Sequence, residues 1–139
     1  MLTYITRKER FNAAHRMYRQ EWTAEENHKV FGKCANPHYH GHNYELWVTI
    51  KGEVDDARPY IIDLKELKII INEYVIDKLD HKNINLDVDF MQGKMATTEL
   101  LCIEIYNQLQ APIALCQGAT LHSIKLAETE NNSAEYFGE

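Results

Sequence analysis

The chain has 139 residues, 45% of them apolar and 26% charged, with a formal net charge of −6. This size and composition are typical of one globular domain, residues 1–139, and the negative charge is unfavourable for a nucleic-acid-binding surface. No apolar run approaches the roughly 18–20 residues that cross a bilayer, and charges stand where a signal peptide would have its apolar stretch. We therefore expect a cytoplasmic protein that binds neither nucleic acid nor membranes.

Two extended segments are predicted in the first half of the chain. The first runs from about Tyr4 to His15. The second runs from Tyr44 to Lys51, where apolar and polar residues alternate with the period of a strand. The side chains expected to face the core from this second strand are Tyr44, Leu46, Val48 and Ile50.

Two helices are predicted in succession after these strands. Asp63, with Glu66 three residues later, reads as a capping box, and apolar residues then recur with helical spacing as far as Leu79. A second helix is expected to start after Thr97 as its N-cap, and Pro112 helps to stop it.

Alternation returns near the C-terminus. It runs from Leu121 to Glu128 and is followed by a turn at Asn131-Asn132 and a short strand from Ala134 to Phe137. Strands that flank two consecutive helices predict an α+β fold, with the helices on one side of an antiparallel sheet.

The histidines form the most informative pattern in the chain. His40-Gly41-His42 places two imidazoles on one face of an extended segment, because alternate residues of a strand share a face. A catalytic zinc usually takes three protein ligands, and His15, at the end of the first strand, is the best candidate for the third. By spacing alone, chance or hydrogen-bonded histidines remain as plausible as a metal site, and His38 shares the parity of His40 and His42.

Cys34 lies in a polar loop and has two interpretations. It is either a fourth ligand that closes a structural zinc site, or a free thiolate beside the metal that serves as a base. The number of cysteines is odd, and the three are widely scattered, which is unlike a disulfide framework.

Three acidic or polar groups complete the candidate set. Asp80-His81 follows the first predicted helix and has two interpretations. It is either a carboxylate–imidazole pair that fixes the tautomer of the histidine, or a solvated helix end. Glu128 shares a face with apolar residues and would need a partner if buried, such as a ligand with two parallel N–H donors. Thr97-Thr98-Glu99 is adequately explained as a helix start.

Taken together, these residues resemble the 6-pyruvoyl-tetrahydropterin synthase family along essentially the whole chain. The likeness is carried by seven blocks in family order. They are Phe11-Asn12-Ala13-Ala14-His15, Ala24-Glu25-Glu26-Asn27, Phe31-Gly32-Lys33-Cys34, His40-Gly41-His42-Asn43-Tyr44, Leu79-Asp80-His81-Lys82-Asn83, Thr97-Thr98-Glu99 and Glu128-Thr129.

The resemblance implies a tunnelling fold (T-fold), with a four-stranded antiparallel sheet and two helices packed on one face. It also implies a homohexamer built from two trimers, with active sites between subunits. Asp80-His81 of one chain would then act on Cys34 of a neighbour.

The resemblance also implies roles for single residues. His15, His40 and His42 would hold zinc, and Cys34 would be the catalytic base with Asp80 and His81 as relay partners. Glu128 would anchor the pterin, whose pocket Thr97, Thr98 and Glu99 would line. Lys33, Arg16 and Arg19 are candidates, on charge alone, to meet the triphosphate.

The implied reaction converts 7,8-dihydroneopterin triphosphate into 6-pyruvoyl-tetrahydropterin and needs no nicotinamide or flavin. The related 6-carboxytetrahydropterin synthases of the queuosine pathway are the main alternative, and a non-catalytic pterin-binding module is a remoter one. The carboxy enzymes have three residues between the cysteine and the His-Gly-His motif, whereas five separate Cys34 from His40 here. The chain departs from the family at Pro37-His38-Tyr39, where smaller residues are expected, and at Ala127, where an aromatic residue is common.

Overall fold

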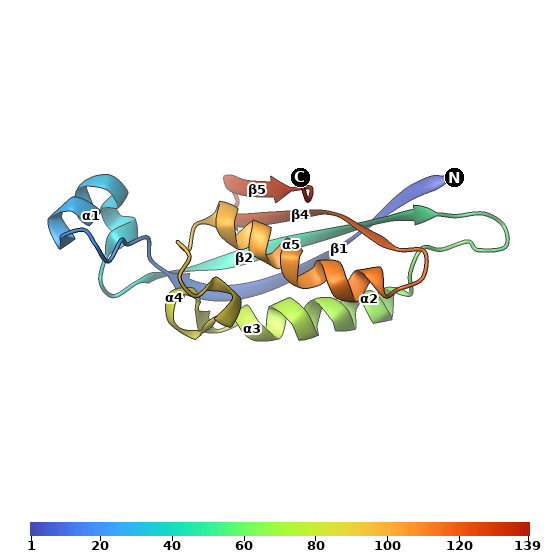
Figure 1. Cartoon of the computed structure of the whole chain (residues 1–139), viewed down its shortest axis with the longest axis horizontal. Helices are drawn as coiled ribbons and strands as arrows, with labels where there is room; N and C mark the ends of the chain where they lie inside the picture. Colours follow the sequence, from blue (N-terminus) through green and yellow to red (C-terminus); the bar gives the residue numbers. More distant parts are fainter.

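A computed structural model describes residues 1–139 as a sheet covered on one face by helices (Figure 1). The strands are β1 (Leu2–His15), β2 (His40–Glu53), β3 (Lys82–Asn83), β4 (Thr120–Thr129) and β5 (Asn132–Tyr136). Their order in the sheet is β3-β1-β2-β4-β5, and β1, β2, β4 and β5 pair in antiparallel fashion. The predicted α+β sheet is confirmed, with one more strand than expected. The additional strand, β3, is only two residues long and pairs in parallel with Ala13 and Ala14 of β1.

Two long helical segments cover the sheet. The first consists of α2 (Leu64–Ile71), a wider π turn at 72–76 and α3 (Asp77–Leu79), and the second is α5 (Thr98–Ala114). Both lie along the same side of the sheet (Figure 1). The shorter helices are α1 (Ala24–Phe31) and α4 (Ile84–Asp87), and α1 forms a lobe at the end of the molecule opposite the N-terminus.

The helix starts follow the sequence only in part. Asp63 caps α2 by accepting a hydrogen bond from the Lys65 N–H at 2.8 Å, but Glu66 does not complete the predicted capping box. Instead, Glu66 accepts a hydrogen bond from the thiol of Cys116. A complete capping box stands at α1, between Thr23 and Glu26.

The predicted second helix starts where expected and ends later than expected. Thr97 is its N-cap, because its hydroxyl oxygen accepts from the Leu100 N–H at 3.2 Å. Pro112 does not end α5, which continues to Ala114. Proline lacks a backbone N–H, yet two further residues close to a helix end can keep helical geometry without that hydrogen bond.

The core lies between the sheet and the two helices. Tyr44, Leu46, Val48 and Ile50 of β2 are each at most 1% exposed, which confirms their predicted inward orientation. They belong to a single cluster of 27 buried residues. Burial of this apolar surface is the main force that fixes the sheet on the helices, and it holds the ends of β1 and β2 in register.

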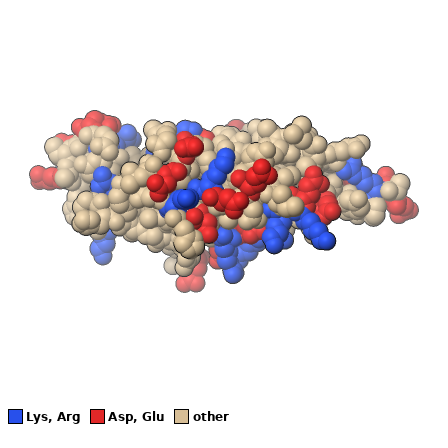
Figure 2. Space-filling view, turned by 90° about the horizontal axis from the view of Figure 1, so that it is seen from below, with Lys and Arg blue, Asp and Glu red and all other residues tan.

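Charged residues of both signs are distributed over the surface. On the face drawn in Figure 2, Lys and Arg are interspersed with Asp and Glu, without a continuous basic field. None of the helices combines the length and the low polarity that a membrane crossing requires.

Candidate functional site

Three histidines meet where β1 ends and β2 begins. His15 pairs directly with His40 in the antiparallel ladder, and His42 pairs with Ala13 two positions away. One nitrogen from each ring belongs to a set whose members all lie within 4.8 Å of one another. His38 is exposed and lies outside this cluster. The register of two strands therefore brings together the three histidines predicted as ligands.

One ring nitrogen of each histidine in this cluster lacks a hydrogen-bond partner in the protein. The Nε2 atoms of His15 and His42 and the Nδ1 atom of His40 are buried without a hydrogen bond. His15 Nδ1 lies 2.6 Å from the carbonyl oxygen of Ala96. A carbonyl only accepts, so this contact places the proton on Nδ1 and leaves the lone pair of Nε2 free. Buried lone pairs are costly to leave unpaired, and a metal ion would satisfy all three.

The charge state of the histidines also suits metal binding. Burial removes water from the rings of His15 and His40 and lowers the pKa of each, and the neighbouring His42 lowers both pKa values further. Neutral imidazole is the form that binds metal, and three imidazoles are a donor set that zinc accepts with bonds of about 2.0–2.1 Å. The residues present therefore fit a zinc ion.

Glu128 lies beside this cluster, at the end of β4. Its Oε2 accepts a hydrogen bond from the Thr98 hydroxyl, and its Oε1 lies 3.2 Å from His42 Nε2. That second contact is an ion-pair distance only, since it does not have hydrogen-bond geometry. The carboxylate is 23% exposed and is therefore held in place while remaining accessible to a ligand. It is not the frayed, solvated strand end that the sequence alone left possible.

The three residues predicted to line the pterin pocket differ in their contacts. The hydroxyl oxygen of Thr97 is occupied by the cap of α5, and the hydroxyl of Thr98 is occupied by Glu128. Glu99 is exposed in the first turn of the helix. Thr98 is thus the residue of the three that orients the carboxylate.

Cys34 lines the same cavity as His15 and Glu128. A pocket of about 690 Å³ is lined by Cys34, His15, Glu128 and the three residues at the start of α5, together with residues 131–135 of the β4–β5 turn and β5. The cysteine is half-buried and its thiol is free. Its sulfur is not a member of the close cluster of metal-donor atoms. The geometry is that of a thiol that shares a cavity with His15 rather than that of a fourth converging ligand.

The lobe that carries Cys34 is fixed by a buried asparagine. Asn27 is 0% exposed, and its Oδ1 accepts from the Arg19 N–H at 2.7 Å. Its Nδ2 donates to the carbonyl oxygens of Arg19 and Thr23, each at 3.0 Å. The Met17 N–H in turn donates to the carbonyl oxygen of Cys34 at 2.8 Å. Sequence reasoning assigned no role to Asn27, although the Thr23–Glu26 capping box marks the helix on which it lies.

A second residue missed by sequence reasoning is the phenol of Tyr44. Its ring lies 5.7 Å from the ring of His42, centroid to centroid, and its hydroxyl is buried without a hydrogen-bond partner. Burial raises the pKa of Tyr44, so the phenol stays protonated and can donate. The alternation of β2 predicted that Tyr44 points inward, but not that its polar end lies beside the histidines.

Asp80 and His81 are held on a different surface. The Asn12 N–H donates to Asp80 Oδ1 at 3.0 Å, and this hydrogen bond is the main reason why the pKa of Asp80 is lowered. Asp80 Oδ2 lies 2.9 Å from His81 Nδ1, so the predicted carboxylate–imidazole pair is present. His81 adopts a positive φ of 61°, and its N–H donates to the Asn12 carbonyl at 2.7 Å.

Within one chain, this pair does not meet Cys34. Asp80 and His81 both line one cavity with Asn12 and Asn43, and His81 also lines a second cavity that includes His42. Neither residue lines the pocket of Cys34. The structure thus links the histidines, Cys34, Glu128 and Thr98, but leaves the Asp80–His81 pair outside the pocket of Cys34.

The fold and this pocket define a class of protein: a T-fold domain with a three-imidazole candidate metal site beside a free thiol and an oriented carboxylate. The model of the family described as 6-pyruvoyl tetrahydropterin synthase matches residues 4–139. The chain belongs to this family.

Individual relatives agree with the family match. The chain is 44% identical, over 135 residues, to the 6-pyruvoyl tetrahydrobiopterin synthase of Dictyostelium discoideum. The aligned region covers 97% of this chain and 96% of the relative. Its fold matches the structure of Caenorhabditis elegans 6-pyruvoyl tetrahydropterin synthase with a TM-score of 0.91 and 32% identity, covering 100% of this chain and 97% of that one. A 6-carboxy-5,6,7,8-tetrahydropterin synthase of Haemophilus influenzae is 28% identical over 125 residues, which cover 76% of this chain and 84% of the relative.

Proposed function

We propose that this protein is a zinc-dependent lyase that converts 7,8-dihydroneopterin triphosphate into 6-pyruvoyl-tetrahydropterin and releases triphosphate. The observation that carries the proposal is the pocket that combines His15, the free thiol of Cys34 and the Thr98–Glu128 pair. His15 belongs to a cluster of three imidazoles, each with an unpartnered nitrogen. Full-length similarity to relatives named for the pyruvoyl product supports the same choice.

The carboxylate of Glu128 binds the pterin ring. An ionised carboxylate accepts two parallel hydrogen bonds, and the amino-pyrimidinone edge of a pterin offers two parallel N–H donors. The hydrogen bond from Thr98 fixes the rotamer of Glu128 before the ligand arrives, which lowers the entropy lost on binding.

His15, His40 and His42 hold the metal, with the proton of His15 fixed on Nδ1 by Ala96. When bound, zinc supplies Lewis-acid polarisation of the side-chain hydroxyl groups of the substrate. This polarisation makes the hydrogen on the adjacent carbon more acidic.

Cys34 is the base that removes that proton. Transfer of the proton through the thiol lets the dihydropterin ring be reduced as the side chain is oxidised, and the C–O bond to triphosphate breaks in the elimination. A thiol that also ligated the metal could not serve as this base, which is why its position outside the cluster of donor atoms supports the proposal.

The active site is proposed to be completed by a second subunit in a homohexamer. Asp80 and His81 lie apart from Cys34 in one chain, and most of β1, from Leu2 to Asn12, has a strand partner on one side only. A neighbouring subunit would place its Asp80–His81 pair against the open side of the Cys34 pocket. The reducing environment of the cytoplasm keeps thiols free and would suit a catalytic Cys34 thiol.

The experiment that tests the function is identification of the product by mass spectrometry with the purified, zinc-loaded protein. The proposal predicts 6-pyruvoyl-tetrahydropterin and free triphosphate. Predominant 6-carboxytetrahydropterin with acetaldehyde would overturn it in favour of the queuosine-type reaction. Binding of zinc and pterin without any product would identify a non-catalytic binding module.

A further inference from the structure

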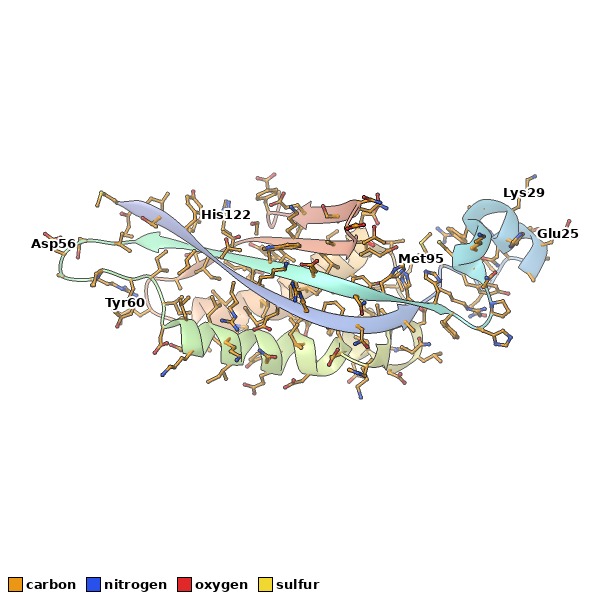
Figure 3. All side chains as sticks on the ribbon, turned by 180° about the vertical axis from the view of Figure 1, so that it is seen from behind. Glu25, Lys29, Asp56, Tyr60, Met95 and His122 are labelled. Atoms are coloured by element: carbon orange, nitrogen blue, oxygen red, sulfur yellow. The ribbon has the colours of Figure 1, made fainter.

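A second pocket, of about 390 Å³, is lined by residues that neighbour the histidine cluster in the sequence. Three of its lining residues are immediate neighbours of the metal site: Arg16 follows His15, Tyr39 precedes His40, and Met95 precedes the Ala96 that bonds His15. Met95 lies toward the end of the molecule that carries α1, with Glu25 and Lys29, and far from Asp56 and Tyr60 (Figure 3). The pocket therefore neighbours the three-histidine cluster along the chain.

Positive charge predominates in this pocket. Its charged lining residues are Arg16, Arg19, Lys94 and Glu21. Arg19 lies 3.6 Å from Glu21, and Lys94 lies 2.7 Å from Glu104. Arg16 takes part in no ion pair, so it is the lining cation whose charge no carboxylate neutralises.

Arg16 is nevertheless held firmly. Its guanidinium carbon lies 4.0 Å from the centre of the Tyr18 ring and 5.2 Å from that of Tyr39. Its backbone N–H donates to Asn85 Oδ1 at 2.9 Å, and its carbonyl accepts from Asn85 Nδ2 at 3.0 Å. A guanidinium stacked on an aromatic face keeps its N–H donors free in its own plane, in the fork that matches two oxygens of a phosphate.

Tyr39 adopts a backbone conformation that large side chains avoid. Its φ is 67°, in the left-handed region, and its N–H is fixed by the Asn36 carbonyl at 3.1 Å. This residue belongs to the stretch Pro37-His38-Tyr39, where the chain departs from the small residues expected of the family. Strain of this kind persists where the side chain has a role, and here that side chain contributes the second ring beside Arg16.

We propose that Arg16, stacked on Tyr18 and flanked by Tyr39, binds the phosphate chain of the substrate in this pocket. The inference rests on the proposed function, because it names the group that holds the triphosphate while the pterin ring is bound at Glu128. Arg19 and Lys94 add long-range attraction, whereas Arg16 supplies the directed hydrogen bonds. The site takes a polyphosphate in its anionic form.

The test is calorimetric titration of the zinc-loaded protein with inorganic triphosphate. We expect Arg16→Gln to weaken triphosphate binding about tenfold or more, since it removes a charged bidentate donor. Arg16→Lys keeps the charge but loses the bidentate donors and the stacking on Tyr18. We expect it to change the logarithm of the dissociation constant by about a third to a half of the change in Arg16→Gln. Tyr39→Asn, which tolerates a positive φ, should weaken binding severalfold. Lys68→Gln, on the exposed surface of α2, is the charge-matched control and should bind as the wild type does.

Three results would overturn the proposal: no triphosphate binding by the wild type at millimolar concentration, equal binding by Arg16→Gln, or an equal loss with Lys68→Gln. A parallel titration with dihydroneopterin, which lacks phosphates, should give the same affinity for Arg16→Gln and the wild type. An equal loss of both ligands would mean that Arg16 only maintains the site.

A measurement on the wild type covers the case in which the variants fail to fold. Inorganic triphosphate should protect Arg16 from modification by phenylglyoxal, as mapped by peptide mass spectrometry, and an unprotected Arg16 would refute the assignment. These readouts need no turnover. Arg16-dependent triphosphate binding without formation of the pyruvoyl product would refute the proposed function and leave this inference standing.

Discussion

The carboxylate of Glu128 lies between two partners of different chemistry, with Oε2 on the hydroxyl of Thr98 and Oε1 3.2 Å from Nε2 of His42. This arrangement places the proposed pterin anchor directly beside a proposed metal ligand. The substrate ring and the metal would consequently share one wall of the cavity, so the reacting side chain would lie over the imidazoles.

The first prediction concerns Glu128. In Glu128→Gln, the side chain keeps its shape but loses the charge that strengthens its hydrogen bonds, each worth about 1.5–3 kcal/mol with a charged partner. We expect pterin affinity to fall about tenfold to a hundredfold while zinc content stays unchanged. Fluorescence titration with dihydroneopterin and elemental analysis measure the two quantities. Loss of zinc together with pterin binding would instead make Glu128 part of the metal site.

The second prediction concerns Cys34. Removal of a general base costs about 10²–10⁴-fold in rate, so Cys34→Ala should lose nearly all turnover. It should keep its zinc and its thermal stability, because the side chain is half-buried and lies outside the donor cluster. Cys116→Ala, which removes a thiol outside the pocket, is the matched control. A Cys34→Ala protein that loses zinc would favour the closed structural site.

The third prediction concerns Asn27, which joins α1 to the segment after β1. Asn27→Ala leaves the N–H of Arg19 without its partner, whereas the carbonyl of Thr23 keeps the backbone N–H of residue 27. An unsatisfied group of this kind costs about 1–3 kcal/mol, so we expect the free energy of unfolding to fall by about that amount in urea titration. Hydrogen exchange should locate the loosening in residues 17–35. Asn132→Ala, at an exposed position of β5, should have little effect.

The fourth prediction concerns the pH dependence of the metal-free protein. Burial lowers the pKa of His15 and His40 in the folded state, whereas in the unfolded state they titrate near the ordinary value of 6.5. Below pH 6.5 the unfolded chain therefore binds more protons, and stability falls as pH decreases. Above pH 6.5 both states hold neutral imidazoles, so this contribution to stability is fully present.

The measurement is urea unfolding of the metal-free protein at a series of pH values from 7.5 to about 5. His15→Gln should show a weaker loss of stability over this range, because the most buried of these imidazoles is absent. An identical pH dependence in the variant and the wild type would contradict the assignment. His122→Gln, at the distant end of β4, provides the comparison.

Much of the fold could be predicted because its signals are local. The inward face of β2 follows from alternation alone, and the helix from Leu64 to Leu79 follows from apolar spacing and Asp63. β3 could not be predicted, because two residues carry no periodicity and their pairing with Ala13 and Ala14 is a tertiary contact. The capping box at Thr23 was readable, whereas the one expected at Asp63 fails because Glu66 bonds to Cys116 across the structure.

The candidate site divides in the same way. The orientation of His40 and His42 follows from strand parity, but the approach of His15 depends on its register opposite His40. The contact between Thr98 and Glu128 joins a helix start to a strand end thirty positions away, and no local pattern specifies it. Position along the chain therefore predicts which groups are available, and the sheet register decides which of them meet.

The last prediction concerns the separation of Cys34 from the Asp80–His81 pair. If the active site forms between subunits, Cys34→Ala and His81→Ala damage different halves of each site. Mixed in equal amounts, dissociated and reassembled together, the two inactive variants should regain about a quarter of the wild-type activity, because one in four interfaces receives two intact halves. Two controls should remain inactive. One is each variant carried alone through the same procedure, and the other is a mixture of Cys34→Ala with Cys34→Ser. His81 is exposed and lines a different pocket from Cys34 within one chain, so any action of His81 on Cys34 would require a neighbouring subunit. Absence of recovery from mixtures that light scattering shows to be reassembled would mean that His81 does not act across the interface.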